Sequence, residues 1–170
     1  MQVGHVAVAG LIASYTTQIS HLAGGPAVPS FSGEALAVAF LAHWLPNFDV
    51  VPIRLGLAKD SFHCTWTHTL LFTSLVGLIL WPINASWALI SVLSIVIHFM
   101  SDIGSSVGLP LLMPFTKKRY TLNLWADTGH SGWIAFKGSY LQTWTWILEG
   151  FVILFLFIRL YQLGIWPFSL

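Results

Sequence analysis

Charged residues are scarce in this sequence. Only 8% of its 170 residues are Asp, Glu, Lys or Arg, whereas 56% are hydrophobic. An ordinary soluble domain carries about a quarter charged residues, so this chain could not cover a water-facing surface. Its length allows a single domain, residues 1–170, and the apolar excess assigns that domain to the membrane class.

The chain also has only one cysteine and a net charge close to zero. The single cysteine, Cys64, excludes a disulfide framework and a cysteine-rich zinc site. A net charge of +1 leaves no basic face to pair with phosphates, which excludes a nucleic-acid binder. The N-terminus has no basic region of the kind that opens a signal peptide, and His5 interrupts its apolar stretch. We therefore expect it to remain in the mature protein.

Apolar stretches predict an all-α bundle of about five transmembrane helices. A helix needs about 20 mostly apolar residues to cross a bilayer core. The third and fourth stretches read as a helical hairpin, because Pro82 and Asn84 supply a tight turn between them. The first two stretches are weaker and rich in small residues, which suit close helix packing. The predicted spans are 3–19, 32–45, 69–81, 87–100 and 144–165.

The basic residues predict an orientation in a bacterial-type inner membrane. Lys and Arg concentrate in cytoplasmic loops. If all five segments cross, six of the seven basic residues share one side with the N-terminus, and only Arg159 lies near the far end of the last span. We therefore expect a cytoplasmic N-terminus and an external C-terminus. The six are Arg54, Lys59, Lys117, Lys118, Arg119 and Lys137.

On this topology, histidines and aspartates converge on the cytoplasmic end of the bundle. Ionisable groups in or near membrane helices are costly and usually mark a functional site. His98 and Asp102 are four residues apart, so an imidazole and a carboxylate share one helix face. The converging groups are His5, His43, Asp49, His63, His68, His98 and Asp102.

These donors predict a divalent metal site. Imidazole and carboxylate without thiolate suit zinc first, with manganese or iron as alternatives, in a site of one or two ions. The competing interpretation is structural, because a single histidine at a membrane interface is more often a hydrogen-bonded group than a ligand. His130 is either an extra ligand or a loop residue. Glu149, inside the last span, is either a structural polar contact or a proton carrier.

Four sequence elements follow one another over roughly two thirds of the chain, residues 4–115. They are Gly4-His5, Leu45-Pro46-Asn47-Phe48-Asp49, His63-Cys64-Thr65-Trp66-Thr67-His68-Thr69, and His98 to Asp102 with Gly108 to Pro114. The fourth element is a His-x-x-x-Asp pair followed by a Gly-x-Pro-Leu-Leu-x-Pro stretch. In type and order, the four elements resemble those of the YdjM-like, LexA-regulated family of inner-membrane metal-dependent hydrolases.

Two positions depart from the family pattern. Asn47 replaces an aspartate, which removes one possible anionic ligand. Cys64-Thr65 replaces Arg-Gly, so an arginine that would face phosphate is missing; Arg54 or the run 117–119 could substitute for it. The order of the ligands also remotely resembles that of bacterial zinc-dependent phospholipase C, which suggests phosphoester hydrolysis.

Together these features predict a membrane-embedded metal-dependent hydrolase that acts on a phosphate ester of a lipid or lipid-linked molecule at the cytoplasmic interface. The expected metal ligands are His5, Asp49, His63, His68, His98 and Asp102, and Asp49 is also the expected general base. The expected head-group contacts are Lys117, Lys118, Arg119 and Arg54, and Asn47, His43 and His130 are possible additional site residues.

Two other functions stay open. A metal-ion or solute transporter would bind the same ion in transit, and it would require polar residues deeper in the bilayer. A non-catalytic structural or regulatory membrane protein would use its histidines for packing. The residues leave the substrate, the oligomeric state and the number of metal ions undetermined.

Overall fold

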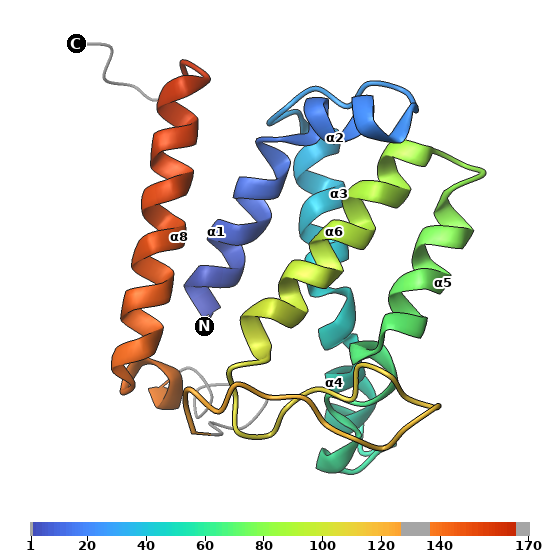
Figure 1. Ribbon diagram of the computed structural model, residues 1–170, viewed down its shortest axis with the longest axis vertical. Coiled ribbons are helices and arrows are strands. Elements are labelled where there is room, and N and C mark those ends of the chain that lie inside the picture. Colours follow the sequence, from blue (N-terminus) through green and yellow to red (C-terminus); the bar gives the residue numbers. More distant parts are fainter. Residues whose placement is uncertain (1, 127–136, 166–170) are drawn as a thin grey trace.

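The computed structural model describes residues 2–126 and 137–165, and the regular secondary structure of that part of the chain is helical, with two isolated β-bridges in place of strands (Figure 1). The predicted all-α class is confirmed. Short 3-10 turns join the helices at Leu45–Asp49, Asp60–Phe62 and Trp66–His68. The helices are α1 (Gln2–Ala13), α2 (Thr16–Ala23), α3 (Gly33–Trp44), α4 (Val50–Arg54), α5 (Leu70–Leu80), α6 (Ala85–Asp102) and α8 (Thr143–Gln162).

Three helical segments of the described chain are long and apolar enough to cross a membrane: Gly33–Arg54, Ala85–Asp102 and Thr143–Gln162. A fourth is present if Asp60–His68 and Leu70–Leu80, which meet at a bend of 53°, count as one span. The apolar stretch Val3–Ala13 of α1 is shorter. The prediction of about five spans is therefore wrong in number: the described chain has three candidate spans, or four with the bent pair, because α1 is too short to cross a bilayer core as a straight helix and α5 reaches that length only together with the bent segment before it.

The first predicted span, residues 3–19, is divided. α1 ends at Ala13, and α2 begins at Thr16. The Ser14 hydroxyl donates to the carbonyl of Leu11 at 2.6 Å, and the Tyr15 amide donates to Ile12, so the chain tightens there instead of continuing the α-helix. Periodicity alone did not reveal this break, because the apolar pattern continues across it.

Small residues bring α3 and α6 close together at the centre of the bundle. Ala35 and Ala39 of α3 are completely buried, and Ile90 of α6 belongs to the same core cluster. α1 adds Val8 and Ile12 to this cluster. The predicted close packing around small residues is therefore present between these helices.

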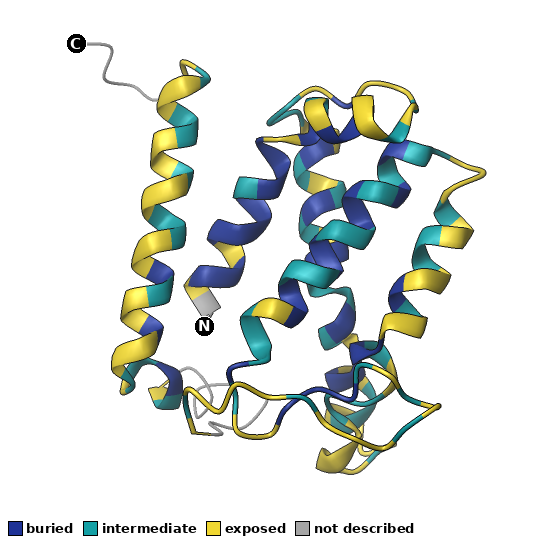
Figure 2. Cartoon of the chain, in the orientation of Figure 1, coloured by how far each residue is buried: buried dark blue, intermediate teal, exposed yellow. Residues whose placement is uncertain are grey.

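The outer helices expose apolar side chains. Figure 2 shows that much of α8 and of α5 is exposed, and the exposed residues include Leu78 and Ile79 of α5 and Phe151 and Phe155 of α8. A water-soluble bundle would not leave such extended faces uncovered. These faces are suited to contact lipid.

One end of the bundle gathers the segments that carry Asp49, Asp102 and five of the histidines. α1 begins there, α3 and α6 end there, and α5 and α8 begin there (Figure 1). The connection 103–126 crosses the same end, where Leu109 and Tyr120 exchange two backbone hydrogen bonds of 2.8 Å. The chain direction of five helices thus delivers residues distant in sequence to one place.

Candidate metal centre

Five of the seven histidines and two aspartates meet at this end of the bundle. Three of the imidazoles, those of His43, His68 and His98, are completely buried. The ring of His98 lies at the centre, with ring centroids 4.8 Å from His5, 5.0 Å from His43 and 5.5 Å from His68. The cluster therefore joins α1, α3, α6 and the turn before α5.

The backbone of α6 sets the tautomer of His43. Its Nδ1 lies 3.1 Å from the Ser94 carbonyl oxygen, which can only accept, so Nδ1 carries the proton. A neutral His43 then presents Nε2 as an acceptor, and this atom is 2.9 Å from Nδ1 of His5. A carbonyl on the distal nitrogen is the usual support of a metal-binding histidine.

His98 and Asp102 form the pair expected from their spacing. Nε2 of His98 is 3.0 Å from Oδ2 of Asp102, and Oδ1 of the same carboxylate is 3.4 Å from Nε2 of His5. The His98 contact falls short of hydrogen-bond geometry, so neither of its ring nitrogens has a hydrogen-bond partner among the described residues. Nε2 of His68 is also buried without a partner within the described chain.

Asp49 organises the adjoining loop. Its Oδ1 accepts from Nδ1 of His63 at 2.7 Å, and its Oδ2 accepts from the Cys64 amide and the Thr67 hydroxyl, both at 2.9 Å. Nδ1 of His68 lies 3.5 Å from the same Oδ2. The amide of Cys64 reaches the carboxylate through a left-handed backbone with φ of 52°.

The residues fit a divalent metal ion. Two groups, His5 with His43 and His98, and His68 with His98 and Asp102, each offer three donor atoms within 4.8 Å of one another. Zinc–nitrogen bonds of about 2.0–2.1 Å at tetrahedral angles place two nitrogens about 3.4 Å apart, a spacing that lies within the 4.8 Å limit of each group. Buried imidazole nitrogens without partners are costly, and a metal ion would satisfy them.

The predicted ligands thus fall into two sets. His5, His68, His98 and Asp102 belong to the donor groups, while Asp49 and His63 lie beside them and bond to each other. His43, expected only as a possible addition, is a full member of the first group. Its signal in the sequence was a lone imidazole on an otherwise apolar helix. Asn47 is half-buried on the turn of Asp49, and His130 lies outside the described residues.

The basic residues expected at the head group differ in what they contact. The Arg119 guanidinium donates to the backbone carbonyls of Cys64 at 3.1 Å and Gly108 at 2.9 Å, and so ties two loops together. Nζ of Lys118 lies 5.3 Å from the centre of the Tyr120 ring. Lys117 and Arg54 are exposed at the same end of the bundle.

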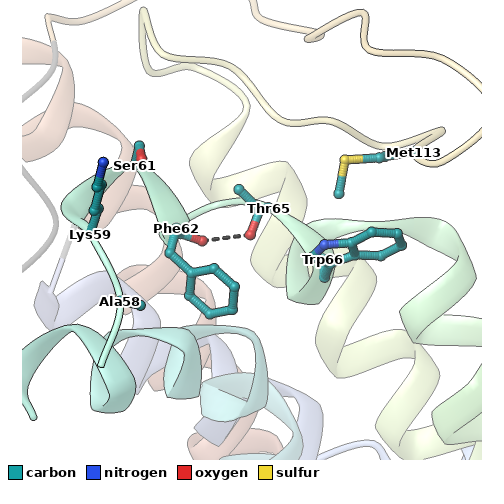
Figure 3. A pocket seen from close by; sticks show the side chains of 7 residues that line it. All are labelled: Ala58, Lys59, Ser61, Phe62, Thr65, Trp66 and Met113. Atoms are coloured by element: carbon teal, nitrogen blue, oxygen red, sulfur yellow. Dashed lines mark hydrogen bonds between the residues drawn. The ribbon is translucent and has the colours of Figure 1, made fainter. Parts of the chain in front are cut away.

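A hollow of about 400 Å³ opens beside the loop that carries His63 and His68 (Figure 3). Phe62, Trp66 and Met113 provide apolar lining, and Lys59 provides the one cationic side chain among its lining residues. A hydrogen bond of 2.5 Å from the Thr65 hydroxyl to the Phe62 carbonyl holds the loop. The hollow combines apolar surface with one positive charge.

Fold and site together define a polytopic helical membrane protein with a buried histidine–aspartate cluster at one end. The chain belongs to the YdjM inner membrane protein family, whose model matches residues 1–166. The match confirms the family resemblance drawn from the four sequence elements and extends it beyond them. Neither the curated proteins nor the solved structures contain a match to the chain.

Proposed function

We propose that this protein is a divalent-metal-dependent hydrolase that cleaves a phosphate ester of a lipid or lipid-linked molecule at the cytoplasmic face of the inner membrane. The observation that carries the proposal is the set of buried imidazole nitrogens on His68 and His98 that have no hydrogen-bond partner among the described residues and lie within reach of a carboxylate. Histidines that served only packing would be expected to satisfy both ring nitrogens.

The proposal assigns roles to both sets of residues. His5, His43, His68, His98 and Asp102 would hold one or two ions, with zinc favoured by the nitrogen-rich donors. A divalent ion held there would polarise a phosphoryl oxygen and activate water. Asp49 accepts a hydrogen bond from Nδ1 of His63 and lies 3.5 Å from Nδ1 of His68, which places it to orient both rings. That Asp49 also acts as the general base stays a prediction.

The hollow and the nearby cations support a lipid phosphate as substrate. An acyl or prenyl chain would pack against Phe62 and Trp66, and Lys59 would face the phosphate. Arg119 lies against the backbone of Cys64, the position where the family pattern has its arginine. Lys117, Lys118 and Arg54 would add positive charge around the entrance.

The transporter alternative gains less support. An ion path would need polar side chains along the bundle axis, and Glu149 was the one candidate. Its carboxylate instead bonds to the backbone of α1 at the histidine end. The alternative of a non-catalytic protein does not explain why ring nitrogens of His68 and His98 are buried without a hydrogen-bond partner among the described residues.

Bound metal in the purified protein tests the proposal. We expect one or two zinc, manganese or iron ions per chain in detergent, measured by mass spectrometry of the elements, and loss of metal in His98→Ala because both donor groups contain His98. His21→Ala is the matched control, since His21 lies in α2 at the opposite end. A wild-type protein that takes up no divalent ion would contradict the proposal; a loaded protein would then be assayed on lipid phosphate esters.

A further inference from the structure

Glu149 is a buried acid that the proposed chemistry does not use. Only 3% of its surface is exposed, although it lies in the second turn of α8, a helix whose other faces are largely apolar and exposed. Its Oε1 accepts the Gly4 amide at 2.8 Å, and Gly4 immediately precedes His5. A buried carboxylate at the start of a helix satisfies donors that the helix itself leaves unpaired.

Tyr140 extends this contact. Its hydroxyl lies 3.0 Å from Oε1 and 2.8 Å from Oε2 of Glu149, to which it donates, and it accepts the Val3 amide at 2.9 Å. Two successive amides of the first turn of α1 are therefore held, one directly and one through the phenol. The indole of Trp146 in turn donates to the Tyr140 carbonyl at 2.9 Å.

The same helix pair has a second polar contact at its other end. The Arg159 guanidinium donates to the Ser14 carbonyl at 3.1 Å and stacks over the Tyr15 ring at 4.2 Å. Both contacts join residues 145 positions apart, because α1 and α8 run side by side in the same direction (Figure 1). Between them, a methyl group on Gly10 would lie 3.4 Å from Leu156. One end of the pair thus touches the histidine cluster, and the other does not.

From this geometry we infer that Glu149 is a positioning residue for His5. With Tyr140 it fixes the first turn of α1, and thereby the place of the His5 imidazole between His43 and Asp102. The last helix then completes a site to which it contributes no ligand. The inference rests on the proposed metal centre, because its consequence is the geometry of a metal ligand.

Cobalt binding to the full-length protein in detergent tests the inference, with Co²⁺ as the sole metal and its visible absorption as the readout. We expect Glu149→Ala to weaken Co²⁺ binding by about tenfold or more, as loss of a residue that orients a ligand commonly does. Tyr140→Phe should have a smaller effect in the same direction. Glu149→Gln keeps an acceptor for the Gly4 amide and should recover most of the affinity. Arg159→Met, which removes the contact at the other end of the same helix pair, should bind Co²⁺ like the wild type.

A double-mutant cycle with His5→Ala separates positioning from general loosening. If Glu149 acts through His5, Glu149→Ala causes no further loss of affinity in the His5→Ala background. Hydrogen exchange of the first turn of α1 should also accelerate in Glu149→Ala and not in Arg159→Met. Wild-type affinity in Glu149→Ala, or an equal loss in both backgrounds, would overturn the inference while leaving the metal centre intact. A wild-type protein that binds no Co²⁺ would overturn the metal centre itself and this role with it.

Discussion

The side chains at the histidine end are of two kinds. Some offer a nitrogen lone pair to a metal ion, and others hold those imidazoles and their loops in place. His68 and His98 present buried nitrogens that have no hydrogen-bond partner among the described residues. Both carboxylate oxygens of Asp49 accept hydrogen bonds from donors in the loop 60–69. This arrangement lets an exposed connection carry a precisely oriented imidazole, because one buried charge holds several groups at once.

Asparagine at position 49 would break this arrangement. Its single oxygen cannot replace two carboxylate oxygens, and its amide would face at least one donor. We expect Asp49→Asn to lower the free energy of unfolding by about 2–4 kcal/mol, since hydrogen bonds to a charged group are worth about 1.5–3 kcal/mol each. Denaturant unfolding in detergent measures this. Ser61→Ala, at an exposed position of the same loop, is the control and should change stability by less than about 0.5 kcal/mol.

Among the larger elements, the connection 103–126 closes the histidine end. It packs through the ring of Trp125, which covers Gly104 just beyond the end of α6. The backbone around this contact is also paired, because the Leu124 amide donates to the Gly104 carbonyl at 2.8 Å. Arg119 then ties the connection to Cys64 and so to the loop of His63.

A methyl group at position 104 would collide with this ring. An added Cβ would lie 2.0 Å from the nearest Trp125 carbon, so the indole would have to move. We expect Gly104→Ala to destabilise the protein by about 1–3 kcal/mol, the usual cost of overpacking, and to speed hydrogen exchange across 104–125. Gly150→Ala is the control, because nothing lies within 4 Å of its added Cβ. Equal stability of the two variants would show that Trp125 does not pack as described.

Across the whole molecule, basic residues and exposed apolar faces are arranged along one axis. The segments that carry six of the seven basic residues lie at the histidine end, while Arg159 lies towards the other end of α8 (Figure 1). Much of α5 and α8 is exposed between the two ends (Figure 2), and large apolar residues are prominent among the exposed positions. A bilayer around these helices would place the histidine cluster near one of its interfaces, and the distribution of positive charge predicts that this interface is the cytoplasmic one.

Labelling of single cysteines tests this orientation. In a Cys64→Ala background, we expect cysteine at Leu22, which is 81% exposed in α2, to react with a membrane-impermeant maleimide in spheroplasts. Cysteine at the exposed Lys118 should react only after the membrane is permeabilised. The reverse pattern would place the histidine end outside and would contradict a cytoplasmic substrate.

Much of this arrangement could be predicted from the sequence. Composition alone assigned the chain to the membrane, because so few charges cannot cover a soluble surface. Four predicted spans match helices to within a few residues at their ends; α3, for example, covers Gly33–Trp44 where 32–45 was predicted. Because successive spans cross a membrane in opposite directions, the sequence also predicted that His5, His98 and Asp102 lie at the same end of the bundle.

Other features were decided only by the tertiary structure. Whether His43 offers its Nε2 to the cluster depends on the rotation of α3 about its axis and on a carbonyl of α6, 51 residues away. The partner of Glu149 could not be predicted from the sequence. Its carboxylate accepts the Gly4 amide, 145 residues away, and this contact exists because α8 lies parallel to α1. Periodicity defines which residues share a helix face, but the neighbouring helices determine what that face meets. The sequence by itself therefore determined the class of the protein and the end at which its polar groups gather, and packing decided which atoms meet there.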